Sequence, residues 1–122
     1  MLKEPTRPSE FEVQAWLWSE LRSLGFNVRG EVKYRLDGGK HSPRKPYCRF
    51  DLAEFRDGEI VGVIEVKSAP IKHKSVGGWK DTRQGRRYLS LPIPLHVVYG
   101  MADAERLVER ARERCAIFDE DG

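Results

Sequence analysis

The stretch that decides the fold is YCRFDLAEFRDGEIVGVIEVK, residues 47–67. Its first part (47–55) alternates apolar and polar side chains, and its last part (59–67) is rich in β-branched residues, which are both patterns typical of β-strands. Between them, RDG (56–58) contains an Asp-Gly pair that favours a tight turn. The segment therefore predicts a hairpin of two antiparallel strands with RDG as its three-residue turn.

The residues before the hairpin predict a helix and a further strand. Ser9 and Glu12 have the spacing of a capping box, and apolar residues then recur at helical spacing, so we expect a helix over about 10–24. FNVRGEVKYRL (26–36) alternates and predicts a strand, and the DGGKHSPRKP that follows predicts a loop. The apolar residues expected on a shared side of this strand are Val28, Val32 and Tyr34.

Three more elements follow the hairpin. TRQGRRYLSL (82–91) predicts a short helix ended by Pro92, PLHVVYG (94–100) predicts a buried strand, and the apolar spacing over 102–115 predicts an amphipathic helix. The order is α-β-β-β-α-β-α, which is an α/β fold. We expect the 122-residue chain to form a single domain, with a core over about 9–115 and a short tail at each end.

Positive charge is concentrated in two segments of the chain. Residues 38–49 and 67–87 contain eleven of the 22 Lys and Arg residues but one of the 19 acidic residues, although the net charge of the whole chain is only +3. Such a concentration favours a polyanionic partner. Two solvated loops rich in Lys and Arg would give the same pattern, so the charge alone leaves both interpretations open.

Nothing in the sequence indicates a membrane or secreted protein. No apolar run approaches the roughly 20 residues that span a bilayer, and MLKEPTRPSEFEV at the N-terminus lacks the apolar core of a secretion signal. We therefore expect an intracellular, cytoplasmic protein with no membrane partner. Cys48 and Cys115 lack the spacing of metal ligands, which favours packing or incidental residues over a chemical role for both.

Three residues of the hairpin carry the chemistry. Glu65 and Lys67 are two apart in a predicted strand, so they share a face, and the antiparallel partner strand can bring Asp51 beside them. Glu65 interrupts an apolar run, where an ionised carboxylate is costly to bury unless a cation meets it. That cation is either Lys67, in a plain ion pair, or a hard metal ion shared by two carboxylates. The metal also explains why the two acids stand beside basic loops.

These residues and the element order resemble the PD-(D/E)XK nuclease superfamily over roughly residues 9–100. Asp51 matches the first acid of the motif, and Glu65-Val66-Lys67 matches its (D/E)XK part. Phe50 stands where the motif has Pro and leaves the carboxylate in place. The resemblance implies a restriction-endonuclease-like core of order α-β-β-β-α-β, followed here by a C-terminal helix.

The predicted short helix adds a second point of resemblance. Gln84 and Tyr88 match the QxxxY motif of lambda-exonuclease-like and related recombination nucleases, and four residues apart they lie on one helix face. The resemblance adds both to the catalytic residues, although a polar surface Gln and a core Tyr would fit the same helix. Gly25-Phe26 and the Gly-rich basic loop resemble archaeal Holliday junction resolvases more weakly.

The activity that the resemblance implies is hydrolysis of phosphodiester bonds by a Mg²⁺- or Mn²⁺-dependent deoxyribonuclease. Asp51, Glu65 and the backbone carbonyl of Val66 would hold the metal ion, and Lys67 would position the nucleophile or stabilise the phosphate. The chain has no sign of a recognition helix for the major groove, so we expect selectivity for DNA structure or ends rather than for sequence.

Three acids near the start of the chain compete for a supporting role. The superfamily often adds an acid from the first helix, and Glu10 is the better candidate because Glu12 is expected to act in the capping box. Glu31 lies on the first strand, where it would either organise a metal ion or face solvent.

Basic residues of the two loops and of the short helix are expected to contact the nucleic-acid backbone. These residues are Arg44, Lys45, Lys72, Lys74, Lys80, Arg83 and Arg87. His41 and His73 lie in the same loops and are candidates for phosphate contacts, and Trp79 either stacks on a base or packs against its own domain. His96 lies in an apolar strand, which favours a hydrogen-bonded core residue.

Two other functions remain open beside the free nuclease. A non-catalytic protein that binds nucleic acid or assembles with partners could keep the same fold and basic loops, although the Asp51, Glu65 and Lys67 set argues against it. The chain could also act as a homodimer or as part of a larger nuclease complex.

Overall fold

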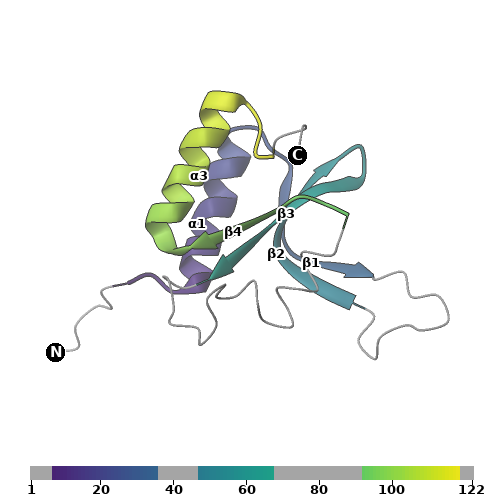
Figure 1. Cartoon of the computed structure of the whole chain (residues 1–122), viewed down its shortest axis with the longest axis horizontal. Helices are drawn as coiled ribbons and strands as arrows, with labels where there is room; N and C mark the ends of the chain where they lie inside the picture. Colours follow the sequence, from purple (N-terminus) through teal and green to yellow (C-terminus); the bar gives the residue numbers. More distant parts are fainter. Residues whose placement is uncertain (1–6, 36–46, 68–91, 119–122) are drawn as a thin grey trace.

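The computed structural model describes residues 7–35, 47–67 and 92–118, and it shows an α/β fold with one four-stranded mixed sheet and two helices (Figure 1). The elements in chain order are α1 (Glu10–Ser23), β1 (Val28–Arg35), β2 (Tyr47–Arg56), β3 (Glu59–Lys67), β4 (Leu95–Tyr99) and α3 (Gly100–Arg114). These six elements confirm the predicted ones, with boundaries that differ by at most two residues. The helix predicted over 82–91 lies outside the described residues.

The first helix begins where the capping box predicts. The backbone N–H of Glu12 donates to Ser9 Oγ at 3.1 Å, and Ser9 Oγ lies 3.3 Å from Glu12 Oε1. Val13, Leu17 and Leu21 recur at a spacing of four residues and are fully buried, so this face of α1 packs against the sheet. The interpretation of Glu12 as a capping residue is confirmed.

The order of strands in the sheet is β1-β2-β3-β4. Its first three strands are antiparallel neighbours, whereas β4 lies parallel to β3, with Lys67 opposite Tyr99 at the end of their register. Figure 1 shows both helices on the same side of the sheet, where α1 and α3 contact each other. The carboxyl ends of β3 and β4 therefore lie side by side.

The turn of the β2–β3 hairpin is shorter than predicted. Arg56 pairs with Glu59, so the turn consists of Asp57 and Gly58 alone, and both have the positive φ angles of a two-residue Asp-Gly turn. Beyond it the register shifts, because Phe55 pairs with Ile60 but Glu54 pairs with Gly62. The prediction of a three-residue RDG turn is therefore wrong, since Arg56 continues the strand.

The skipped residue in this register is Val61, which forms a β-bulge and decides what faces Asp51. Continued without a bulge, the register of the turn would place Asp51 opposite Ile64. The observed register beyond the bulge pairs Leu52 with Ile64 and so places Asp51 opposite Glu65. A one-residue slip of a strand exchanges its two faces, so the bulge is what brings the two acids together.

The sheet has a core cluster on each side. Ile64 and Leu52 lie in the cluster under the helices, whereas their neighbours Val63 and Ala53 lie in the second cluster, on the opposite side. The expectation that Val28, Val32 and Tyr34 share a side is wrong, because Val28 belongs to the first cluster and the other two pack against the second. The change of side occurs at Glu31, whose φ of 54° interrupts the extended strand.

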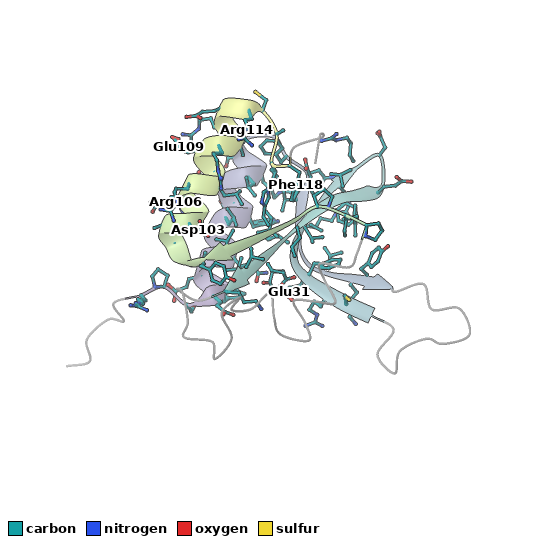
Figure 2. The ribbon with its side chains drawn as sticks, in the orientation of Figure 1. Glu31, Asp103, Arg106, Glu109, Arg114 and Phe118 are labelled. Atoms are coloured by element: carbon teal, nitrogen blue, oxygen red, sulfur yellow. The ribbon has the colours of Figure 1, made fainter. Side chains whose placement is uncertain are left out.

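The chain after α3 folds back onto the sheet. Phe118 is buried and lies between α3 and the sheet (Figure 2), where its ring occupies the space that a side chain on Gly62 would need. The ring of His96 stacks on Phe118 with centroids 4.9 Å apart, and His96 Nε2 is hydrogen-bonded to the Ile117 carbonyl at 3.0 Å. His96 is thus hydrogen-bonded, as predicted, but it is half-buried and not a core residue.

Of the two cysteines, Cys48 has a packing role and Cys115 does not. Cys48 is buried in the second core cluster, and Cys115 is exposed at the C-terminal end of α3. Within the residues that the structure describes, neither helix has the length and apolar character that crossing a membrane requires.

Candidate metal and catalytic site

The candidate site lies where the β2–β3 ladder ends. The last paired residues are Leu52 and Ile64. At the next position, the side chains of Asp51 and Glu65 accept hydrogen bonds from the backbone of the opposite strand. The Asp51 N–H donates to Glu65 Oε1 at 3.2 Å, and the Val66 N–H donates to Asp51 Oδ2 at 2.8 Å. Each carboxylate thus accepts a hydrogen bond from the backbone of the opposite strand, which fixes the two acids side by side.

Burial and mutual repulsion make full ionisation of this pair costly. Glu65 has only 2% of its surface exposed, and burial, followed by the negative charge of Asp51, raises the pKa of Glu65 to about 9. Burial also raises the pKa of Asp51, although the Val66 N–H and the charge of Lys67 oppose this shift. Both shifts disfavour the state in which the two carboxyl groups are ionised together.

Lys67 lies at the last position of β3, two residues from Glu65 and on the same face of the strand. It is partly exposed, and its positive charge lowers the pKa of both carboxyl groups. For Glu65 this effect is smaller than those of burial and of the Asp51 charge, because the pKa remains far above its usual range. Lys67 therefore offsets only part of the unfavourable charge.

The donor set of this pair suits a hard divalent cation. Carboxylate oxygens are the ligands that Mg²⁺ and Mn²⁺ prefer, and a cation would favour the ionised form of both carboxyl groups, whose pKa values burial raises. Among residues 7–35, 47–67 and 92–118, no three His, Cys, Asp or Glu side chains come together as a metal site. From the described residues, Asp51 and Glu65 would supply two carboxylates to a metal ion held here, and backbone carbonyls and water are further ligands that such an ion accepts. The predicted role of the Val66 carbonyl stays a prediction.

A third carboxylate stands beside the pair without joining it. Glu31 is exposed, and its negative charge raises the pKa of Asp51. Its side chain lies 3.8 Å from Arg49 and accepts a hydrogen bond from Gln14. Figure 2 shows Glu31 toward the lower edge of the sheet, well separated from Phe118. Of the two interpretations of Glu31, the structure supports an exposed residue that acts on Asp51 through its charge.

Gln14 is the residue at this site that the sequence analysis missed. Its Nε2 donates to the Asp51 carbonyl at 3.0 Å and to Glu31 Oε1 at 3.1 Å, so it connects α1 to both β1 and β2. Gln14 is three and seven residues before the buried Leu17 and Leu21. The sequence feature that could have identified Gln14 is its position, because it is a polar residue where the helical spacing predicts an apolar one.

Glu10 lies one helical turn before Gln14, so the two share a face of α1. Glu10 is exposed in the first turn of the helix. The contact with Asp51 is made by Gln14, and the role of Glu10 as an additional acid stays a prediction.

The other predicted residues fall in segments 36–46 and 68–91, outside the described residues. The two predicted catalytic residues among them are Gln84 and Tyr88. The predicted nucleic-acid contacts there are Arg44, Lys45, Lys72, Lys74, Lys80, Arg83 and Arg87, and the loop residues His41, His73 and Trp79 belong to the same segments.

Comparison of the chain with protein families, with curated proteins and with solved structures gives no match.

Proposed function

We propose that this protein is a metal-dependent nuclease that hydrolyses phosphodiester bonds in DNA, on a restriction-endonuclease-like core. The observation that carries the proposal is the buried Asp51 and Glu65 pair on adjacent strands, with Lys67 on the same face of β3. The order α1-β1-β2-β3, followed by β4 parallel to β3, agrees with this core. The second helix of the core is the one that the sequence predicts over 82–91. The resemblance of these residues to the PD-(D/E)XK motif gives the same function.

In this proposal Asp51, Glu65 and the Val66 carbonyl hold Mg²⁺ or Mn²⁺. A bound divalent cation supplies Lewis-acid chemistry, which lowers the pKa of water and neutralises charge on the scissile phosphate. The protein contributes the fixed placement of the two carboxylates, because the N–H groups of Asp51 and Val66 hold one oxygen of each. Deprotonation of Glu65 then accompanies metal binding.

Lys67 supplies the fixed positive charge of the site. A cationic side chain beside two acids can orient a water molecule or stabilise the additional negative charge of the phosphate in the transition state. Gln84 and Tyr88 would orient the phosphate from the predicted helix, and the basic residues of the two loops would hold the flanking DNA backbone. Because phosphate contacts carry no sequence information, selectivity for DNA structure or ends follows.

The proposal is tested by incubating the purified protein with four DNA substrates: circular single-stranded, linear duplex, nicked duplex and a four-way junction. We expect cleavage with Mg²⁺ or Mn²⁺ and none in excess EDTA. Lys67→Ala and Glu65→Gln should each lower the cleavage rate by at least about 100-fold while DNA binding is largely retained. Lys33→Ala, which removes an exposed lysine from β1, is the matched control and should cleave at the wild-type rate.

Two outcomes would contradict the proposal. Cleavage that persists in excess EDTA would remove the metal from the mechanism. DNA binding without cleavage on every substrate, with wild-type binding by Lys67→Ala, would indicate the non-catalytic binding protein instead. Cleavage only after addition of a cell extract would point to a nuclease that requires a partner.

A further inference from the structure

The β1–β2 ladder skips one position, and that position contains Asp51. Gly30 pairs with Leu52 and Val32 pairs with Phe50, but Glu31 and Asp51 between them are not paired. Glu31 has a φ of 54°, a conformation that costs a residue other than glycine about 1–2 kcal/mol. The β1–β2 ladder therefore does not itself fix Glu31 and Asp51.

Gln14 connects the two strands at this position. One amide group carries two N–H donors, and here one acceptor lies on each strand: the Asp51 carbonyl at 3.0 Å and Glu31 Oε1 at 3.1 Å. The helix that carries Gln14 is itself fixed, because Val13 and Leu17 on either side of it are fully buried. Gln14 therefore ties the unpaired position of the sheet to the rigid part of the fold.

The backbone of Asp51 is consequently held on both sides of its Cα atom. Its carbonyl accepts from Gln14 on α1, and its N–H donates to Glu65 on β3. The carboxylate of the same residue accepts from the Val66 N–H. A change in the Asp51 carbonyl contact would tilt its peptide and move the carboxylate relative to Glu65.

We propose that Gln14 is a positioning residue, which holds the Asp51 peptide and the Glu31 carboxylate in the arrangement that the metal-binding pair requires. The inference rests on the proposed function, since it assigns Asp51 to metal binding. Residues that orient metal ligands without touching the metal typically change metal affinity or activity by about 10–100-fold when replaced. Gln14 acts through Asp51 and contacts no substrate in this assignment.

The test uses Gln14→Met, because methionine has nearly the same length but no N–H donor. Ala15→Met is the matched control, since it introduces the same side chain at the next, exposed position of α1. Calorimetric titration with Mn²⁺ alone should give a Kd about 10–100-fold higher for Gln14→Met. Ala15→Met should stay within about twofold of wild type, as expected for a surface substitution.

A conservative variant separates the hydrogen bond from simple packing. In Gln14→His the ring Nε2–H can reach the place of the amide nitrogen and donate to the Asp51 carbonyl, so this variant should recover most of the lost affinity. In the metal-free protein, the amide NMR signals of Asp51 and Val66 should shift in Gln14→Met and stay in place in Ala15→Met. This measurement depends on neither cleavage nor metal.

The outcomes distinguish this inference from the proposed function. A wild-type Kd for Gln14→Met, equal losses for the Met and His variants, or unmoved amide signals would overturn the role of Gln14 alone. A wild-type protein that binds no Mn²⁺ and cleaves no DNA would overturn the proposed function, and the positioning role with it.

Discussion

Replacing Glu65 with Gln should change how the stability of the metal-free protein depends on pH. Gln retains the size and shape of the side chain but cannot ionise. In the folded protein, burial and the charge of Asp51 raise the pKa of Glu65 from its ordinary value of 4.5 to about 9. The folded state therefore holds one more proton on this group than the unfolded state between these two pH values.

The sign follows from the direction of that shift. Stability falls with rising pH wherever the folded state binds more protons, so the contribution of protonated Glu65 is complete below pH 4.5 and is lost as the pH rises toward 9. Each pH unit in this window costs about 1.4 kcal/mol. Between pH 5 and pH 8 wild type should thus lose on the order of 4 kcal/mol relative to Glu65→Gln.

The assay is urea unfolding in EDTA at pH 5, 6, 7 and 8 for both proteins. Glu54 is also buried, and burial raises its pKa, but it is present in both proteins and cancels in their difference. Glu59→Gln serves as the control, because Glu59 is exposed at the start of the same strand. This variant should follow the wild-type curve.

The reasoning would be refuted by parallel curves. If wild type and Glu65→Gln lose the same stability between pH 5 and pH 8, Glu65 is ionised in the folded protein over this whole range. The pair would then be neutralised by a protein cation such as Lys67, and the case for a metal ion would lose its electrostatic support. Saturating Mn²⁺ at pH 8 should in contrast recover much of the wild-type loss.

Three further predictions concern the metal, the packing and the DNA contacts. Asp51→Asn removes a proposed metal ligand and a repelling charge, so in EDTA its melting temperature should be no lower than that of wild type. With metal at a hundredfold excess over Kd, the free energy of unfolding should rise by about 2.7 kcal/mol for wild type and by little for this variant. Strong destabilisation of this variant in EDTA would make Asp51 a structural residue. Gly62→Ala should lower the free energy of unfolding by about 1–3 kcal/mol in denaturant titrations, because the new methyl group would meet the Phe118 ring, and an unchanged value would contradict that packing. Joint neutralisation of four basic loop residues should flatten the slope of log K for DNA against log salt by up to about four, and an unchanged slope would leave these residues a solubilising role. The four residues are Arg44, Lys45, Lys72 and Lys74.

The elements of the fold could be predicted because each one has a local cause. The capping box of Ser9 and Glu12 sets the start of α1, and alternating or β-branched residues set the strands. The register of the hairpin could not be predicted in the same way. It depends on the bulge at Val61, and a β-branched residue at that position has no pattern that separates it from its neighbours in the strand.

At the candidate site too, the sequence indicates which residue types matter but not where all of these residues lie. Asp51, Glu65 and Lys67 stand out in the sequence because charged residues interrupt apolar strands, and the structure places the two acids in contact through backbone N–H groups. Gln14 has no charge and lies 37 residues from Asp51, so only the packing of α1 on the sheet shows that the two meet. The left-handed conformation of Glu31 is equally invisible, since Gly30 beside it is the residue a pattern would choose.

The irregularities of the sheet explain how this chain can orient two carboxylates and still leave most of their acceptor sites unused by the backbone. Where the β2–β3 ladder ends, side chains take over its hydrogen bonds: Asp51 accepts from the Val66 N–H, and Glu65 accepts from the Asp51 N–H. A carboxylate has about four lone-pair sites, so one backbone N–H fixes its direction and leaves most of its acceptor capacity. The bulge at Val61 is therefore more than a defect in pairing, because without it Asp51 would face Ile64 and the second carboxylate would turn to the other side of the sheet.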